Sequence, residues 1–143
     1  MINITSYIIE KLHLNDKIKM DIMHAEYPEG STCLLLYFPS DHAWGNVKCW
    51  PDAVKIVKHE DREITFKYLT NTRSQRPEHL KDSIKYIEAM KDAENKNIYK
   101  VENGGIIILV TPETSLNQLE KTKDDKECQA SFKDIDEIKK HLK

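Results

Sequence analysis

The run TCLLLYF at residues 32–38 decides the expected fold, because every position after the threonine is apolar. A strand with one buried face alternates apolar and polar residues, whereas a strand covered on both faces is apolar throughout. The turn sequence PEGS at residues 28–31 precedes the run and Pro39 follows it, and such residues bound strands. We therefore expect residues 32–38 to form a central strand that is covered on both sides.

Other segments of the chain show strand patterns as well. Residues 17–27 begin with Ile18, Met20 and Ile22 alternating with charged side chains, the period of a half-buried strand. A proline at position 51 is expected to interrupt the next strand. The expected strands are residues 17–27, 32–38, 47–50, 53–58, 63–69, 97–101 and 106–111. The last four of these form two hairpins, which favours a mainly antiparallel sheet.

Three helices are predicted from apolar residues that recur at helical spacing. A short one covers residues 4–13, and a long one begins at Pro77 and runs to residue 95 with Leu80 and Ile84 on its stripe. A final helix begins near Ser131 with a capping-box pattern. Residues 114–130 are charged and poor in apolar side chains, which fits either a mobile linker or a frayed helix.

These elements predict one α+β domain over residues 1–143, in the order αβββββαββα. Helices on one face of an antiparallel sheet give a two-layer domain. In this arrangement the sheet packs against the long helix 77–95, and the short terminal helices complete the layer or mediate self-association.

Composition narrows the class of protein. The 143 residues include 39% hydrophobic and 32% charged side chains, and the formal net charge is −2, a mix typical of a globular protein with no general attraction to nucleic acid or anionic membranes. The three cysteines are widely spaced, so no disulfide framework is expected. No apolar run is long enough to span a membrane. We expect a cytoplasmic protein, and the abundance of lysine, isoleucine and asparagine indicates a bacterial or phage origin.

The loop before the long helix is a candidate anion-binding site formed by Arg73, Ser74 and Arg76. Arginine binds phosphate or carboxylate through paired hydrogen bonds, and a helix N-terminus adds unpaired N–H groups. This reading gives a phosphate- or nucleotide-binding protein, or a small enzyme with His42 or His79 as its base. The alternative is a solvated loop whose arginines pair with neighbouring acidic residues.

A second candidate is a protein interface formed by His42, Trp44 and Trp50. Tryptophan is frequent at the centres of interfaces, and both tryptophans lie in or beside predicted loops. The alternative is that both rings fold back onto the core.

Other chemistries have weaker patterns. Asp41, His42, Cys49 and His59 contain no closely spaced ligand pair, so we expect no metal, and no catalytic residue or cofactor is assigned. Lysines alternate with apolar residues from Lys55 to Lys67, which suggests a face for single-stranded nucleic acid. The near-neutral net charge gives this hypothesis no support. The same alternation is also typical of the solvent-facing side of a half-buried sheet.

The sequence therefore favours a non-enzymatic protein that binds another macromolecule or itself. Accessory, inhibitor, chaperone and virion-accessory proteins are all of this type. A small anionic ligand at the Arg73–Arg76 loop is the first alternative, and binding of single-stranded nucleic acid is the second.

Overall fold

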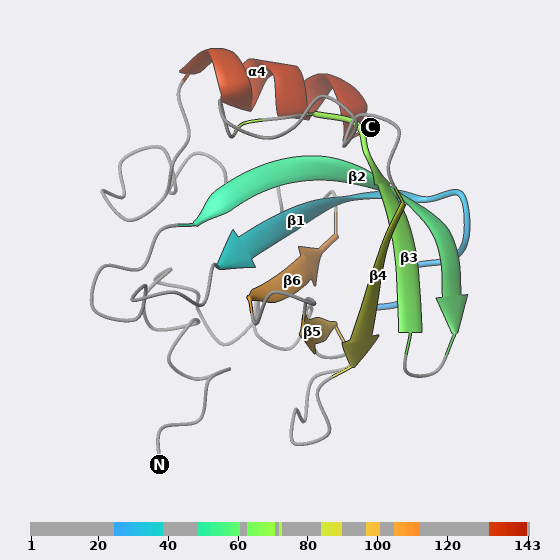
Figure 1. The fold of residues 1–143 in the computed structure, drawn as a ribbon. Coiled ribbons are helices and arrows are strands. Elements are labelled where there is room, and N and C mark those ends of the chain that lie inside the picture. Colours follow the sequence, from blue (N-terminus) through green and yellow to red (C-terminus); the bar gives the residue numbers. More distant parts are fainter. Residues whose placement is uncertain are drawn as a thin grey trace.

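The structure, a computed structural model, describes residues 25–38, 49–60, 63–70, 72, 84–89, 97–100, 105–111 and 132–142. Within these residues it contains six strands and one helix (Figure 1). They are β1 (Thr32–Phe38), β2 (Trp50–Glu60), β3 (Glu63–Tyr68), β4 (Ile84–Ala89), β5 (Ile98–Lys100), β6 (Ile106–Val110) and α4 (Phe132–His141).

The strands form one strongly curled antiparallel sheet. Each strand pairs with the next in chain order, and β6 pairs back onto β1, so the ladder closes into a barrel. The pairing between β4 and β5 is short, because these strands share only the pairs Glu88–Lys100 and Ala89–Tyr99. A closed ladder leaves few unpaired strand edges.

The expected α+β fold with a long helix on a sheet is wrong. Residues 84–89, inside the predicted helix 77–95, form β4 and pair with β3 from Ile84–Lys67 to Glu88–Glu63. Leu80, Ile84 and Ile87 do match a helical stripe, but helix propensity is a weak preference that tertiary pairing overrides. Strand β3 needs a partner on its second side for the sheet to close, and β4 is that partner.

The predicted break at Pro51 is also wrong, since β2 runs without interruption from Trp50 to Glu60. Pro51 lies opposite Leu36 of β1, and its carbonyl accepts a hydrogen bond from Thr72 Oγ1 (2.8 Å). The N–H and C=O groups of one strand residue point to the same side, so the missing N–H faces the β3 side. On that side the last β2–β3 pair is Val54–Tyr68, so β3 does not extend as far as Pro51. The proline therefore costs the sheet no hydrogen bond between strands.

Several predictions about the sheet are confirmed. Residues 32–38 form a strand in which Cys33 to Phe38 are all buried. Both predicted hairpins are present as β2–β3 and β5–β6. The turn before β1 is closed by a hydrogen bond from Ser31 N to Pro28 O (3.0 Å), and Gly30 occupies the left-handed region at φ 87°, which glycine adopts without strain.

The inside of the barrel is the hydrophobic core. Residues directly opposite each other share a face, so the register of β1 places Cys33, Leu35 and Tyr37 inside. The interior cluster comprises Tyr27, Cys33, Leu35, Tyr37, Val54, Ile56, Ile64, Phe66, Tyr68, Tyr99, Ile107 and Leu109. Gly105 lies close to the Tyr37 ring, and a Cβ at that position would come within 2.8 Å of it.

The final helix is confirmed as α4, which lies over β2 (Figure 1). Its buried side chains Ile135, Ile138 and Leu142 recur at spacings of three and four residues, the pattern of one helix face. Asp134 in the first turn and Lys139 in the last complement the helix dipole. In the part of the chain that the structure describes, no helix combines the length and hydropathy needed to cross a membrane.

Helix 4–13 and segment 114–130 lie outside the described residues, as does most of the expected strand 17–27. The last residues of that strand, from Ala25 to Tyr27, are irregular and lead directly into the turn before β1.

Candidate functional site

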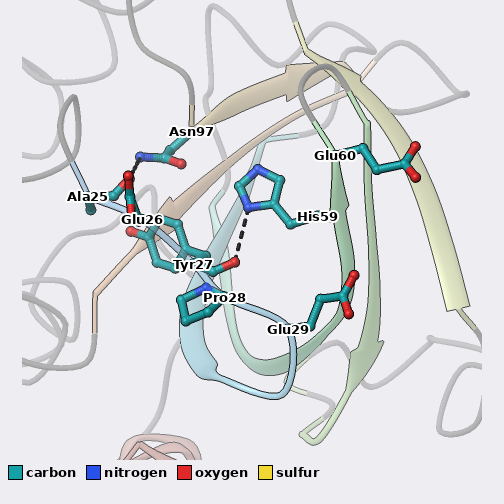
Figure 2. A pocket seen from close by; sticks show the side chains of 8 residues that line it. All are labelled: Ala25, Glu26, Tyr27, Pro28, Glu29, His59, Glu60 and Asn97. Carbon is teal, nitrogen blue, oxygen red and sulfur yellow. Dashed lines mark hydrogen bonds between the residues drawn. The ribbon is translucent and has the colours of Figure 1, made fainter.

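A pocket of about 340 Å³ opens where the chain before β1 meets the end of β2 and the start of β5 (Figure 2). Figure 2 shows the irregular segment on one side of it and the end of β2 on the other. Its lining residues are Ala25, Glu26, Tyr27, Pro28, Glu29, His59, Glu60 and Asn97. Three chain segments far apart in sequence therefore meet in one concave site, the usual setting of a binding site.

A β-bulge brings His59 into the pocket. The β2–β3 register shifts between Ile56 and Lys58, so that His59 lies opposite Ile64, a residue of the interior. Strict alternation from Ile56 would place Lys58 inside the barrel and His59 outside. The extra residue, Val57, reverses this alternation, and bulges commonly redirect side chains in this way.

Both ring nitrogens of His59 have hydrogen-bond partners. Nδ1 lies 3.1 Å from the carbonyl oxygen of Tyr27, which can only accept, so Nδ1 carries a proton. Nε2 lies 2.9 Å from the hydroxyl of Tyr99. In the neutral ring Nε2 therefore accepts the Tyr99 hydroxyl proton, and the tautomer and orientation are both fixed.

Tyr99 keeps its proton and donates it in the hydrogen bond to His59 Nε2. Its side chain belongs to the barrel interior, and burial raises the pKa of its phenol, with Cys33 adding a smaller effect of the same sign. The phenolate is disfavoured because it would lose its hydration. Tyr99 thus anchors the histidine and is not itself accessible to a ligand.

Two further hydrogen bonds hold the irregular segment against the barrel. The Tyr27 hydroxyl donates to the carbonyl of Leu109 (2.9 Å), and Asn97 Nδ2 donates to the carbonyl of Ala25 (3.1 Å). The backbone of Asn97 also accepts from the N–H of Leu109 (3.0 Å). The pocket wall is therefore fixed to β5 and β6, even though it contains no regular secondary structure.

The mouth of the pocket is acidic. Glu26, Glu29 and Glu60 are all exposed, and Figure 2 shows the Glu60 carboxylate directed away from the His59 ring. Lys58 forms an ion pair with Glu60 (2.9 Å). The hydrogen bond and the charge of Glu60 raise the pKa of Lys58, and the charges of Glu29 and Glu63 raise it further. The local field therefore favours positive charge.

The structure does not describe most of the residues in the sites predicted from the sequence. Arg73, Ser74, Arg76, His42 and Trp44 lie outside the described residues. Trp50 is half-buried against the core cluster, with its ring centroid 6.1 Å from that of Tyr37.

The chain that leads toward the predicted anion loop is firmly attached to β2. The buried carboxylate of Asp52 accepts hydrogen bonds from Thr70 Oγ1 and Thr72 N (3.0 Å each). The Thr70 hydroxyl oxygen in turn accepts from the N–H of Ala53 (2.8 Å). Asp52 is thus a structural carboxylate that holds the end of the β2–β3 hairpin.

Among the residues weighed as metal ligands, His59 lines the pocket and Cys49 is buried. Over the described residues, no group of three or more His, Cys, Asp or Glu side chains is arranged to hold a metal ion. Burial also raises the pKa of the Cys33 thiol far above its ordinary range, which makes this cysteine a poor nucleophile.

Sequence reasoning missed the pocket. Tyr27, His59, Asn97 and Tyr99 have no motif spacing, and only closure of the barrel brings them together. The available signal was Asn97, a polar residue at the start of an apolar hairpin whose side chain needs a partner when buried. Comparisons with family models, curated proteins and solved structures gave no match.

Proposed function

We propose that the protein is a non-enzymatic binding protein that takes a basic segment of another macromolecule at the acid-rimmed pocket. The observation that carries this proposal is the pair of exposed glutamates, Glu26 and Glu29, at the rim of a cavity whose histidine is fully hydrogen-bonded. Carboxylates at a concave mouth bind lysine or arginine side chains by charge-assisted hydrogen bonds.

Binding suits this pocket better than catalysis does. A general base needs a free lone pair within reach of a substrate proton. Neutral His59 uses Nε2 to accept from Tyr99 and Nδ1 to donate to Tyr27. Tyr99 is buried and holds its proton tightly. The groups left for a ligand are the rim carboxylates of Glu26 and Glu29, which supply charge and hydrogen-bond acceptors.

The alternatives for the function remain predictions. The phosphate or nucleotide site at Arg73 and Arg76 rests on residues outside the described ones. A nucleic-acid face from Lys55 to Lys67 is disfavoured by Glu60 and Glu63, which lie on the same side of the same two strands, because phosphates are repelled by carboxylates.

The test is a titration of the ¹⁵N-labelled protein with an acetylated tetrapeptide of alternating lysine and arginine, followed by NMR. We expect amide shifts confined to the residues around Glu26, Glu29 and His59, and an affinity that falls steeply with added salt. The double variant Glu26→Gln, Glu29→Gln is expected to bind about fivefold to tenfold more weakly, because it removes two ion pairs.

The matched control is Glu137→Gln, which removes an exposed carboxylate from α4 and is expected to leave peptide binding unchanged. A same-length peptide of alternating glutamate and serine is expected not to bind. Shifts at other surfaces, or equal affinity for the acidic peptide, would contradict the proposal.

A further inference from the structure

The ring of His59 offers the pocket a flat surface and no free hydrogen-bonding atom. Hydrogen bonds at the ring nitrogens lie in the plane of the ring. Both are in use, at Nδ1 with the Tyr27 carbonyl and at Nε2 with the Tyr99 hydroxyl (Figure 2 shows the first). Because His59 lines the cavity and is only partly buried, a ligand in the cavity meets the carbon and π surface of a ring whose orientation is fixed.

The rest of the cavity adds apolar surface and negative charge. Ala25 and Pro28 line it together with the ring, and they offer contact to the methylene groups of a long side chain. Glu26 and Glu29 are exposed at its rim. The volume of about 340 Å³ is near the lower end of the range for ligand pockets, about 300–1,000 Å³. The cavity therefore suits a single long cationic side chain.

Lys58 does not occupy this site. It directly precedes His59 on β2, and neighbouring strand residues point to opposite faces of the sheet, so it lies on the outer face. Its amine pairs with Glu60 at 2.9 Å, and Glu29 acts on it only as a weaker charge. Among the residues that the structure describes, Glu26 and Glu29 form no ion pair of their own.

These features favour arginine over lysine. A guanidinium group is planar, carries its N–H donors in that plane and stacks on aromatic faces. Its face can lie against the His59 ring while its donors point outward to Glu26 and Glu29. A lysine ammonium is a compact, strongly hydrated charge with three donors in different directions. A donor directed at the ring finds no acceptor there, and an unsatisfied donor is costly.

We propose that the pocket is an arginine-recognition site, in which the guanidinium stacks on the face of His59 and donates to Glu26 and Glu29. The inference rests on the proposed function, since it names the basic side chain that the site takes. The carboxylates supply attraction that arginine and lysine share, whereas the ring face supplies the preference between them. His59 is therefore the specificity-determining residue.

The first test compares ligands on the wild-type protein, by NMR titration at mildly alkaline pH, where a histidine ring is neutral. The probes are capped tripeptides in which glycines flank arginine, lysine or citrulline. We expect arginine to bind about twofold to fivefold more tightly than lysine, the size of an exposed contact between a cation and a ring. Citrulline is planar but uncharged, and we expect it to bind more weakly than either.

The arginine peptide also reports on the stacking directly. Protons above an aromatic face are shielded, so we expect the arginine δ protons to move upfield on binding. This comparison needs no protein variant and therefore does not depend on whether a variant folds.

The second test separates the face of His59 from its hydrogen bonds. His59→Phe and His59→Leu both remove the two hydrogen bonds, but only phenylalanine keeps a flat ring. We expect His59→Phe to retain the preference for arginine and His59→Leu to bind the arginine and lysine peptides equally. His141→Leu, on α4 and outside the pocket lining, is the control and is expected to change neither affinity. The amide spectrum of each variant checks its fold.

The outcomes distinguish this inference from the proposed function. A wild type that binds neither basic peptide, or binds citrulline as tightly as arginine, would refute the proposed function and the inference with it. Equal binding of arginine and lysine would leave the proposed function standing and overturn the inference alone. A preference that folded His59→Leu retains, or that folded His59→Phe loses, would also overturn it, because the ring face would not be its source.

Discussion

The two sides of the barrel differ in what covers them. On β6, β1 and the first half of β2, the outward residues are as deeply buried as the inward ones, and Leu34, Ala53 and Val110 have exposures of 0–1%. On β3 the outward residues Glu63, Thr65 and Lys67 are exposed or partly exposed. The outer face of one side of the barrel is therefore buried, and the outer face of the other side is exposed to solvent.

This difference explains where function is expected. On the covered side the outward residues Leu34, Leu36, Ala53 and Val110 are apolar and buried, so packing is the main constraint on this part of the sequence. The open side and the adjoining end of β2 hold the bulge and the acidic pocket. Among the described strands, the open side is therefore the part of the barrel that a partner could contact.

The strongest test of the contrast places the same charge on both sides. Leu34→Lys buries an amine on the outer face of β1, where the native side chain is fully buried, and we expect it to lower the free energy of unfolding by about 4 kcal/mol or more. Thr65→Lys places the amine at an outward position of β3, and we expect a change within about 0.5 kcal/mol. Urea unfolding at low protein concentration measures both.

Similar losses in the two variants would show that the outer face of β3 is covered as well. A small loss in Leu34→Lys would show that β1 lies at the surface, contrary to the burial seen here.

The covered side is also the part of the fold that the sequence predicts well. An uninterrupted apolar run such as residues 32–38 has few stable settings other than a strand covered on both faces, so β1 was correctly predicted. The hairpins were predicted because their strands and turns are adjacent in sequence. Both features depend on short-range patterns, which are visible in one chain.

The errors concern long-range pairing. Residues 84–89 have apolar spacing that fits a helix, and no local signal shows that β3 needs a second partner. Pro51 was expected to end a strand. A strand tolerates proline where the missing N–H faces no partner strand, and at Pro51 this depends on where β3 ends. The pocket was missed for the same reason, since Tyr27, His59 and Asn97 meet only when β6 closes onto β1.

Alkaline pH offers a test of the barrel interior through Cys33, which lies on the inward face of β1. Burial raises the pKa of this thiol in the folded state, whereas in the unfolded chain it is about 8.5. Below that value the thiol is neutral in both states and the stability is fully present. As the pH rises above it, the unfolded chain loses the proton while the folded protein keeps it, so the stability falls by up to about 1.4 kcal/mol per pH unit.

Cys33→Ala removes this contribution. We expect its free energy of unfolding to fall less steeply than that of the wild type between pH 8 and pH 10, so that the two values converge. A cysteine on the open side, Thr65→Cys in the Cys33→Ala background, provides the control and is expected to leave the slope of the Cys33→Ala protein unchanged. Parallel curves for wild type and Cys33→Ala would mean that water reaches the thiol.

The smallest expected effect concerns the pocket, where the covered interior meets the open side. Tyr99→Phe removes the hydroxyl that donates to His59 Nε2 while keeping the ring in the core, and we expect a loss of about 1 kcal/mol in the free energy of unfolding. Tyr27→Phe removes a hydroxyl of similar burial that bonds Leu109 O, and it leaves both contacts of His59 in place. We expect the two variants to be similarly destabilised but to differ in the ¹⁵N chemical shifts of the imidazole, which change only in Tyr99→Phe. If the imidazole shifts of Tyr99→Phe match those of the wild type, the tyrosine does not hold the ring, and the rim carboxylates alone would define the pocket.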